Sequence, residues 1–145
     1  MKRNLLLNYV ANLSNELGIT PPKVKINDKH FRGTTKIASL ESDGNYCHLY
    51  VRNNQDDVEL LFAIAHELRH KYQIDNGLFN FDNYKSSSDI SIRDYNLQPV
   101  EIDANAFAYM LMKDEFNIEM KYNGLDKDIV ELIKKRAKEI LKNEY

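Results

Sequence analysis

The sequence predicts an α+β domain in which a small twisted sheet of about three strands packs against two central helices, with a further helix toward each end. Three observations support this. Apolar residues recur at helical spacing in four segments, three short stretches before residue 52 alternate polar with apolar residues, and no linker separates the two groups. The length of 145 residues suits one domain, so we expect residues 1–145 to form a single unit.

Two of the helices lie in the first half of the chain. The first is expected over residues 3–17 and ends at Gly18, because glycine suits a left-handed C-cap. The second begins at Asp56 or Asp57, either of which can cap it, and runs to about residue 72. It is apolar on several sides, so we place it in the middle of the domain.

The other two helices lie in the second half. Pro99 suits the first turn of a helix that continues to about residue 113. The last helix follows residue 124 and carries four apolar residues at helical spacing, Ile129, Ile133, Ala137 and Ile140. Its lysines and Arg136 are diluted by glutamates, so this helix is expected to present a solvated face rather than a nucleic-acid patch.

Three short strands are expected over residues 23–26, 36–40 and 47–51. The last two flank Glu-Ser-Asp-Gly-Asn at residues 41–45, which is typical of a turn, so we expect them to pair as a hairpin. Residues 75–98 are rich in Asn, Asp, Ser and Tyr without periodicity. An irregular segment of that length is either mobile or functional.

The composition indicates the compartment and excludes some partners. The net charge of -2 with both signs interspersed implies neither direct nucleic-acid binding nor a membrane surface. Cys47 is the only cysteine, which excludes an internal disulfide and fits a reducing compartment. Polar residues interrupt the first apolar run too early for a signal peptide. We therefore expect a cytoplasmic protein.

A metal-binding pattern lies in the second predicted helix, which reads His66-Glu67-Leu68-Arg69-His70. Histidines at i and i+4 project from one face of a helix, so both can reach the same ion. A catalytic zinc takes three protein ligands and leaves a position for water, which requires one further donor from elsewhere in the chain. Glu67 lies about 100° around the helix from His66. From there its carboxylate can reach that water and act as general base.

Other uses of the histidines are less consistent with the sequence. Glu67 and His70 also form the Glu-x-x-His pair of di-iron bundles, but that site needs a second such pair. His30 and His48 have asparagines three residues before them, so neither completes one. We expect both to be surface or strand residues rather than ligands.

The third ligand is expected from the helix that opens with Pro99. Glu101 lies in its first turn, and Ala104 follows on the same side, where a small side chain allows close approach to the histidine helix. Asn105 is placed to hydrogen-bond a metal-bound histidine or Glu101. Asp103 points away from Glu101 and is the fallback ligand.

The pattern His66-Glu67-x-x-His70 followed by Glu101-x-x-Ala104-Asn105-x-Phe107-Ala108 resembles the ImmA/IrrE-like metallopeptidases of bacteria and their mobile elements, which are of the gluzincin type. The resemblance covers roughly residues 24–113. It implies a minimal zincin-like fold, with His66, His70 and Glu101 as zinc ligands and Glu67 as the catalytic residue.

The resemblance also implies features of the substrate site. The hairpin ending in Leu49-Tyr50-Val51 is similar to the strand that lies over the cleft in zincins and pairs with extended substrates. A tyrosine of the irregular segment, such as Tyr84 or Tyr95, is expected to stabilise the oxyanion as in other zincins. Family members often accompany a helix-turn-helix repressor that they cleave, so a repressor-type regulator is the implied substrate.

The leading hypothesis is therefore a zinc-dependent peptidase acting on a regulatory protein. The alternative is a non-catalytic interaction module that keeps the zincin frame and its metal. A zinc-dependent amidase is a third hypothesis, weaker because nothing in the chain suggests a cell-wall binding part. Two histidines and one carboxylate also accept iron, cobalt or manganese.

Overall fold

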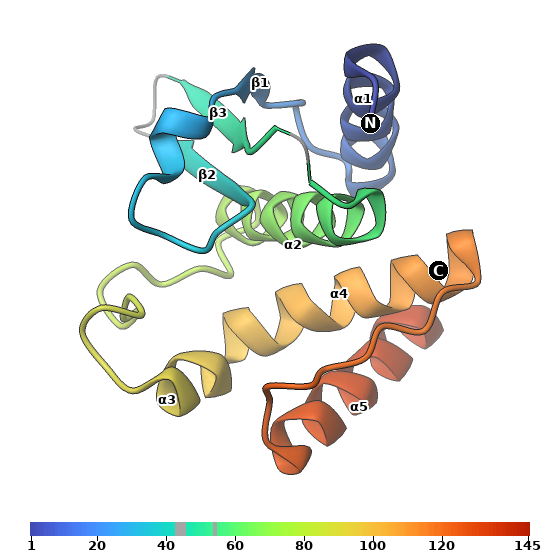
Figure 1. The fold of residues 1–145 in the computed structure, drawn as a ribbon. Helices are drawn as coiled ribbons and strands as arrows, with labels where there is room; N and C mark the ends of the chain where they lie inside the picture. The colour runs from blue at the N-terminus through green and yellow to red at the C-terminus, as the bar shows by residue number, and fades with distance from the viewer. Residues whose placement is uncertain (43–45, 54) are drawn as a thin grey trace.

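The chain forms helices and a small mixed sheet, as seen in a computed structural model that describes residues 1–42, 46–53 and 55–145 (Figure 1). In chain order the elements are α1 (Arg3–Leu17), β1 (Lys23–Ile26), the 3-10 helix η1 (Asp28–Phe31), β2 (Ala38–Ser42), β3 (Cys47–Val51), α2 (Asp57–Asp75), α3 (Ile92–Leu97), α4 (Pro99–Phe116) and α5 (Lys127–Glu144). The predicted α+β class is confirmed.

The sheet has the strand order β1-β3-β2, with β1 parallel and β2 antiparallel to β3. The predicted pairing of the last two strands is confirmed. β2 begins and ends two residues later than expected, so Glu41 and Ser42 belong to the strand and not to a turn. This register pairs Ala38 with Val51 and buries both side chains against the helices. The other predicted turn residues, 43–45, lie outside the described residues.

α2 occupies the middle of the domain, between the sheet and α4 (Figure 1). Asp56 is its N-cap, and the carboxylate accepts a hydrogen bond from the Glu59 N–H at 3.2 Å. Ile64, Ala65 and Leu68 are fully buried. A helix covered on opposite sides must be apolar around much of its circumference, which agrees with the sequence.

The terminal helices α1 and α5 each pack against one of the two central helices. α1 packs against α2 and ends where predicted, at Gly18, whose φ of 68° lies in the left-handed region. α5 packs against α4 through the predicted stripe, in which every residue is buried: Ile129, Ile133, Ala137 and Ile140. Most of the other residues of α5 are exposed to solvent, as expected for a surface helix.

Two short helical elements were not predicted. The segment 75–98 contains α3, whose N-cap Ser91 accepts a hydrogen bond from Asp94 N–H at 3.1 Å. η1 follows β1 and is capped by Asn27. Neither shows an apolar period, because elements of six and four residues offer too few positions.

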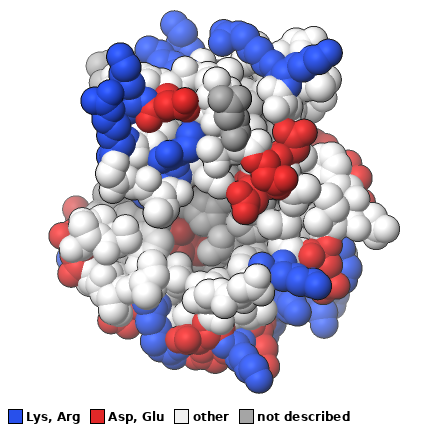
Figure 2. Space-filling view, in the orientation of Figure 1, with Lys and Arg blue, Asp and Glu red and all other residues white. Residues whose placement is uncertain are grey.

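The front face is hollowed between the sheet and the lower helices, and an acidic side chain is visible at the bottom of the hollow (Figure 2). Lysines and arginines gather around the sheet above it (Figure 2). Among the described residues, no helix combines the length and apolar character that crossing a membrane requires.

Candidate metal centre

α2 and α4 bring three metal-ligand side chains together. His66 and His70 lie one turn apart on α2, and their side chains are 16% and 10% exposed. Glu101 lies in the first turn of α4 and is 1% exposed. Ala104 and Ala108 of α4 are fully buried, which is consistent with the predicted close approach of the two helices. The pair of helices thus places a carboxylate opposite two imidazoles.

The donor atoms converge on one point. The two Nε2 atoms of His66 and His70 are 3.1 Å apart. Each of these nitrogens lies 3.1 Å from an oxygen of the Glu101 carboxylate. A tetrahedral zinc with bonds of about 2.0–2.1 Å holds its ligand atoms about 3.3 Å apart. The residues therefore fit such an ion, and this group of three could hold a metal.

Hydrogen bonds from outside the group orient both imidazoles. His66 Nδ1 is 2.9 Å from Asn105 Oδ1, which is the partner that the sequence predicted. His70 Nδ1 is 2.8 Å from Gln73 Oε1. Such contacts leave the Nε2 atoms as the metal-facing nitrogens. Sequence reasoning missed Gln73, although its position three residues after His70 places it on the same face of α2.

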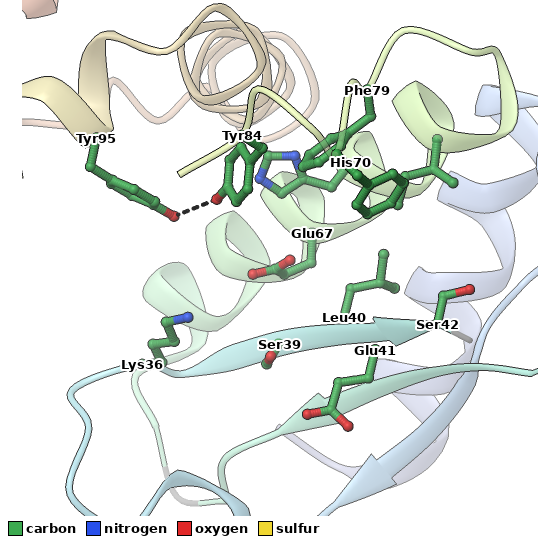
Figure 3. Close-up of a pocket in the computed structure, with 12 residues that line it drawn as sticks. Lys36, Ser39, Leu40, Glu41, Ser42, Glu67, His70, Phe79, Tyr84 and Tyr95 are labelled. Atoms are coloured by element: carbon green, nitrogen blue, oxygen red, sulfur yellow. Dashed lines mark hydrogen bonds between the residues drawn. The ribbon is translucent and has the colours of Figure 1, made fainter. Parts of the chain in front are cut away.

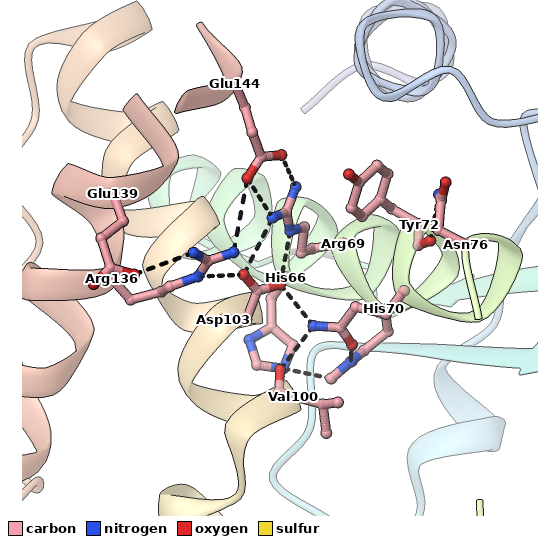
Figure 4. Close-up of polar contacts among 11 residues, drawn as sticks. His66, Arg69, His70, Tyr72, Asn76, Val100, Asp103, Arg136, Glu139 and Glu144 are labelled. Carbon is pink, nitrogen blue, oxygen red and sulfur yellow. Dashed lines mark hydrogen bonds and ion pairs between the residues drawn. The ribbon is translucent and has the colours of Figure 1, made fainter. Parts of the chain in front are cut away.

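Asp103, the fallback ligand, is engaged elsewhere. Its carboxylate accepts hydrogen bonds from Arg69 Nε at 2.8 Å and from Arg136 Nε at 2.8 Å (Figure 4). It lies on the side of α4 that faces these arginines and is no member of the three-residue group. The geometry therefore favours Glu101 over Asp103, as the sequence did.

The Glu101 carboxylate and the His70 imidazole shift each other's pKa values. Burial disfavours ionised Glu101, but its hydrogen bonds to His66 and His70 outweigh burial and hold the pKa well below its usual range. Burial likewise opposes protonation of His70, yet the hydrogen bond to Glu101 and its charge raise the pKa of His70 to about 9. Without a metal, the raised pKa of His70 favours a proton on that imidazole beside the Glu101 carboxylate. A divalent cation would supply the same positive charge at the same place.

Glu67 lies beside the group and not within it. Burial raises the pKa of Glu67, and the neighbouring imidazoles of His66 and His70 partly oppose this. Its carboxylate points into the space between β2 and the two tyrosines Tyr84 and Tyr95 (Figure 3). A carboxylate with a raised pKa, free of the ligand set, suits a general base near neutral pH. The di-iron hypothesis required Glu67 as a ligand, which this arrangement does not support.

A cleft runs past Glu67 on both sides. A cavity of about 390 Å³ lies on the His70 side, and one of about 350 Å³ lies on the His66 side. Both are lined by Lys36, Glu67 and Tyr95, so they meet above the general-base candidate. This cleft coincides with the hollow between sheet and helices.

The strand along the cleft is β2, the first strand of the predicted hairpin, whereas Leu49-Tyr50-Val51 lie on its second strand, β3. Residues 39–42 of β2 line the larger cavity. Successive side chains of a strand point to opposite faces, so four consecutive lining residues mean that the cavity runs along the strand's edge. β3, with Leu49-Tyr50-Val51, lies between β1 and β2 and has no free edge to offer a substrate.

Both candidate tyrosines reach the site. The hydroxyls of Tyr84 and Tyr95 donate to Glu101 Oε1 at 2.8 and 3.0 Å, and they lie 3.2 Å from each other. Burial raises the pKa of both phenols, and the Glu101 carboxylate raises it further. They therefore remain protonated donors at neutral pH. The irregular segment is thus part of the site and supplies one wall of the cleft.

The remaining histidines, His30 and His48, lie at the sheet, one beside it and one within it. His30 of η1 stacks on Tyr50 with ring centroids 3.7 Å apart, and its Nε2 is 3.1 Å from Glu41. His48 is part of β3 and contacts Tyr46 and Tyr50 through its ring. Both side chains are thus held by aromatic neighbours, away from the three-residue group.

Comparison with known proteins identified no relative of this chain: no family model, no curated protein and no solved structure matches it.

Proposed function

We propose that this chain is a zinc-dependent peptidase that hydrolyses an extended protein segment. One observation carries the proposal: the group of His66, His70 and Glu101 opens onto the same cleft as Glu67, and the edge of β2 forms a wall of that cleft. A metal site, a base and a peptide-binding edge are the parts that peptide hydrolysis by activated water requires.

The ligand set is suited to a catalytic ion. Three protein ligands leave one position for water, whereas structural zinc sites are closed by four. When bound, zinc lowers the pKa of its water and polarises the carbonyl of the substrate. His66 and His70 are held by Asn105 and Gln73, so their Nε2 atoms need no reorientation to bind it.

Glu67 acts as the general base in this proposal. Its carboxylate takes a proton from the attacking water and later gives a proton to the amine that leaves. Burial keeps its pKa above the ordinary value, which favours both transfers near neutral pH. The hydroxyls of Tyr84 and Tyr95 donate to Glu101 on the opposite wall, and in this proposal they turn from Glu101 to the oxyanion during the reaction.

The free edge of β2 supports an extended substrate. Arg52 N–H donates to Ile37 C=O at 2.8 Å, and bonded positions alternate along an antiparallel pair. The backbone groups of Ala38 and Leu40 therefore point away from β3. Among the described residues, no hydrogen bond occupies the N–H or C=O of Leu40. A peptide that adds a strand here would pass over Glu67.

The test compares two carboxylates of the same cleft. Glu67→Gln should slow cleavage of a disulfide-reduced, unfolded test protein by at least about 10²-fold, because the base is lost. Glu41→Gln should cleave at nearly the wild-type rate, since Glu41 lines the cavity without belonging to the metal group. Both variants should keep their zinc.

Mass spectrometry of the digests and elemental analysis of the proteins measure these outcomes. If Glu67→Gln cleaves as fast as wild type, Glu67 is not the base. If zinc-loaded wild type cleaves neither the unfolded protein nor a mixed peptide library, the non-catalytic interaction module is the better assignment.

A further inference from the structure

A buried ion network joins the end of α5 to α2. Arg69 is 1% exposed, although it lies inside the histidine motif. Its guanidinium donates to both carboxylate oxygens of Asp103 at 2.8 and 3.1 Å, and to both oxygens of Glu144 at 3.0 and 3.1 Å (Figure 4). Two paired carboxylates on one arginine fix the position of three helices relative to one another.

Asp103 connects this network to the metal ligands. Its Oδ1 also accepts from Arg136 Nε at 2.8 Å, and its Oδ2 accepts from Gln73 Nε2 at 2.8 Å. Arg69 of α2 and Arg136 of α5 hold the Asp103 carboxylate from two sides (Figure 4). These two arginines therefore fix together the orientation in which Oδ2 accepts from the Gln73 amide.

The Gln73 amide can take only one orientation here. Its Nε2 faces two acceptors, the Val100 carbonyl oxygen at 3.0 Å and Asp103 Oδ2, which use both of its N–H groups. Oε1 must then face His70 Nδ1, which donates to it at 2.8 Å. A flipped amide would place Nε2 against His70 Nδ1 and the single oxygen Oε1 against both acceptors, and both changes are unfavourable.

We propose that Asp103 and Gln73 are positioning residues that set the affinity of the metal site through the orientation and tautomer of His70. A proton fixed on Nδ1 leaves the lone pair of Nε2 for the metal. Arg136 pairs with Asp103 directly and Glu144 pairs with Arg69, so α5 influences His70 through this chain of contacts. The inference rests on the metal site of the proposed function, and it does not require that site to be catalytic.

The test measures metal affinity, and activity is not needed. Zinc dissociation constants come from competition with a chromophoric chelator, and the visible absorption of the cobalt-loaded protein reports the ligand geometry. Gln73→Met keeps the side-chain length but removes the amide, so it should weaken zinc binding by about 10- to 100-fold. It should also alter the cobalt spectrum.

A double-mutant cycle separates positioning from stability. Asp103→Asn keeps the size of the side chain but leaves one acceptor oxygen for Gln73, Arg69 and Arg136, so it should weaken zinc binding as well. The double variant Gln73→Met/Asp103→Asn should lose no more zinc affinity than Gln73→Met alone, because Asp103 acts on His70 only through the Gln73 amide. Leu13→Ala, a core truncation in α1 outside this network, controls for general destabilisation and should bind zinc as wild type does.

The measurements distinguish failure of the positioning role from failure of the proposed function. Wild-type affinity and spectrum in Gln73→Met, or an equal loss of affinity in Leu13→Ala, would overturn the positioning role while leaving the metal site intact. Failure of wild type itself to bind zinc or cobalt would refute the proposed function, and this inference with it.

Discussion

Replacement of Arg69 by methionine should destabilise the protein strongly. Arg69→Met preserves much of the aliphatic stem but removes the guanidinium, which lies over the rings of Tyr72 and Phe107 at 4.3 and 5.1 Å. The change removes the charge that pairs with Asp103 and Glu144. Asp103 and Glu144 each lose a bidentate partner, although both side chains are mostly buried.

The magnitude follows from what the two carboxylates retain. Removing one partner of a buried ion pair costs about 3–5 kcal/mol, because the other charge stays buried and unpaired. Asp103 is 14% exposed but keeps Arg136 and Gln73, and Glu144 is 29% exposed and can be hydrated. We therefore expect a loss at the lower end, about 3 kcal/mol. For a chain of this length that lowers the melting temperature by about 6–12 °C.

Urea unfolding followed by circular dichroism, together with a thermal scan, measures the loss. Arg93→Met is the matched control, because Arg93 also pairs with two carboxylates, Asp126 and Asp128, but its side chain is 47% exposed. Exposed pairs are screened by water, so this variant should unfold at the wild-type midpoint. A loss below about 1 kcal/mol in Arg69→Met, or equal losses in the two variants, would refute the reasoning from burial.

Two further predictions concern acid stability and the tyrosines. Burial would raise the pKa of Asp103, but the hydrogen bonds and the charge of Arg69 outweigh burial and lower it. Ionised Asp103 therefore stabilises the fold at pH values above its unfolded pKa of about 3.9. This contribution to the free energy of unfolding is lost as pH falls through the folded pKa. The difference in unfolding free energy between wild type and Asp103→Asn should thus shrink below about pH 4, and a constant difference down to pH 2 would contradict this. At saturating zinc, Tyr84→Phe and Tyr95→Phe should each slow cleavage by about 10²-fold if the hydroxyls stabilise the oxyanion, whereas unchanged rates would limit them to holding Glu101.

The ligand group was predictable because local spacing determines most of it. His66 and His70 are one helical turn apart, and the first turn of the next long helix offered Glu101 with a small residue three positions later. Helical periodicity and the need for a third donor sufficed to select these residues. The structure brings all three together with Asn105.

The strand that borders the cleft and the ion network were not predictable in the same way. Which of two paired strands borders the cleft depends on where β1 adds to the sheet, and β1 pairs with β3 over a connection that carries no pairing signal of its own. Arg69 and Glu144 are 75 residues apart, and only the packing of α5 on α4 joins them. Gln73 acquires its role from Asp103 on another helix, which no spacing within α2 reveals.

The most direct test of the account is the zinc content of the purified, untagged protein. The chain has four histidines, which provides internal controls. Elemental analysis should find about one zinc per chain in wild type and in His30→Ala and His48→Ala, and none in His66→Ala or Glu101→Ala, because three ligands are needed to hold the ion. Wild-type protein without zinc after incubation with the metal at neutral pH, or zinc retained in both ligand variants, would contradict the account.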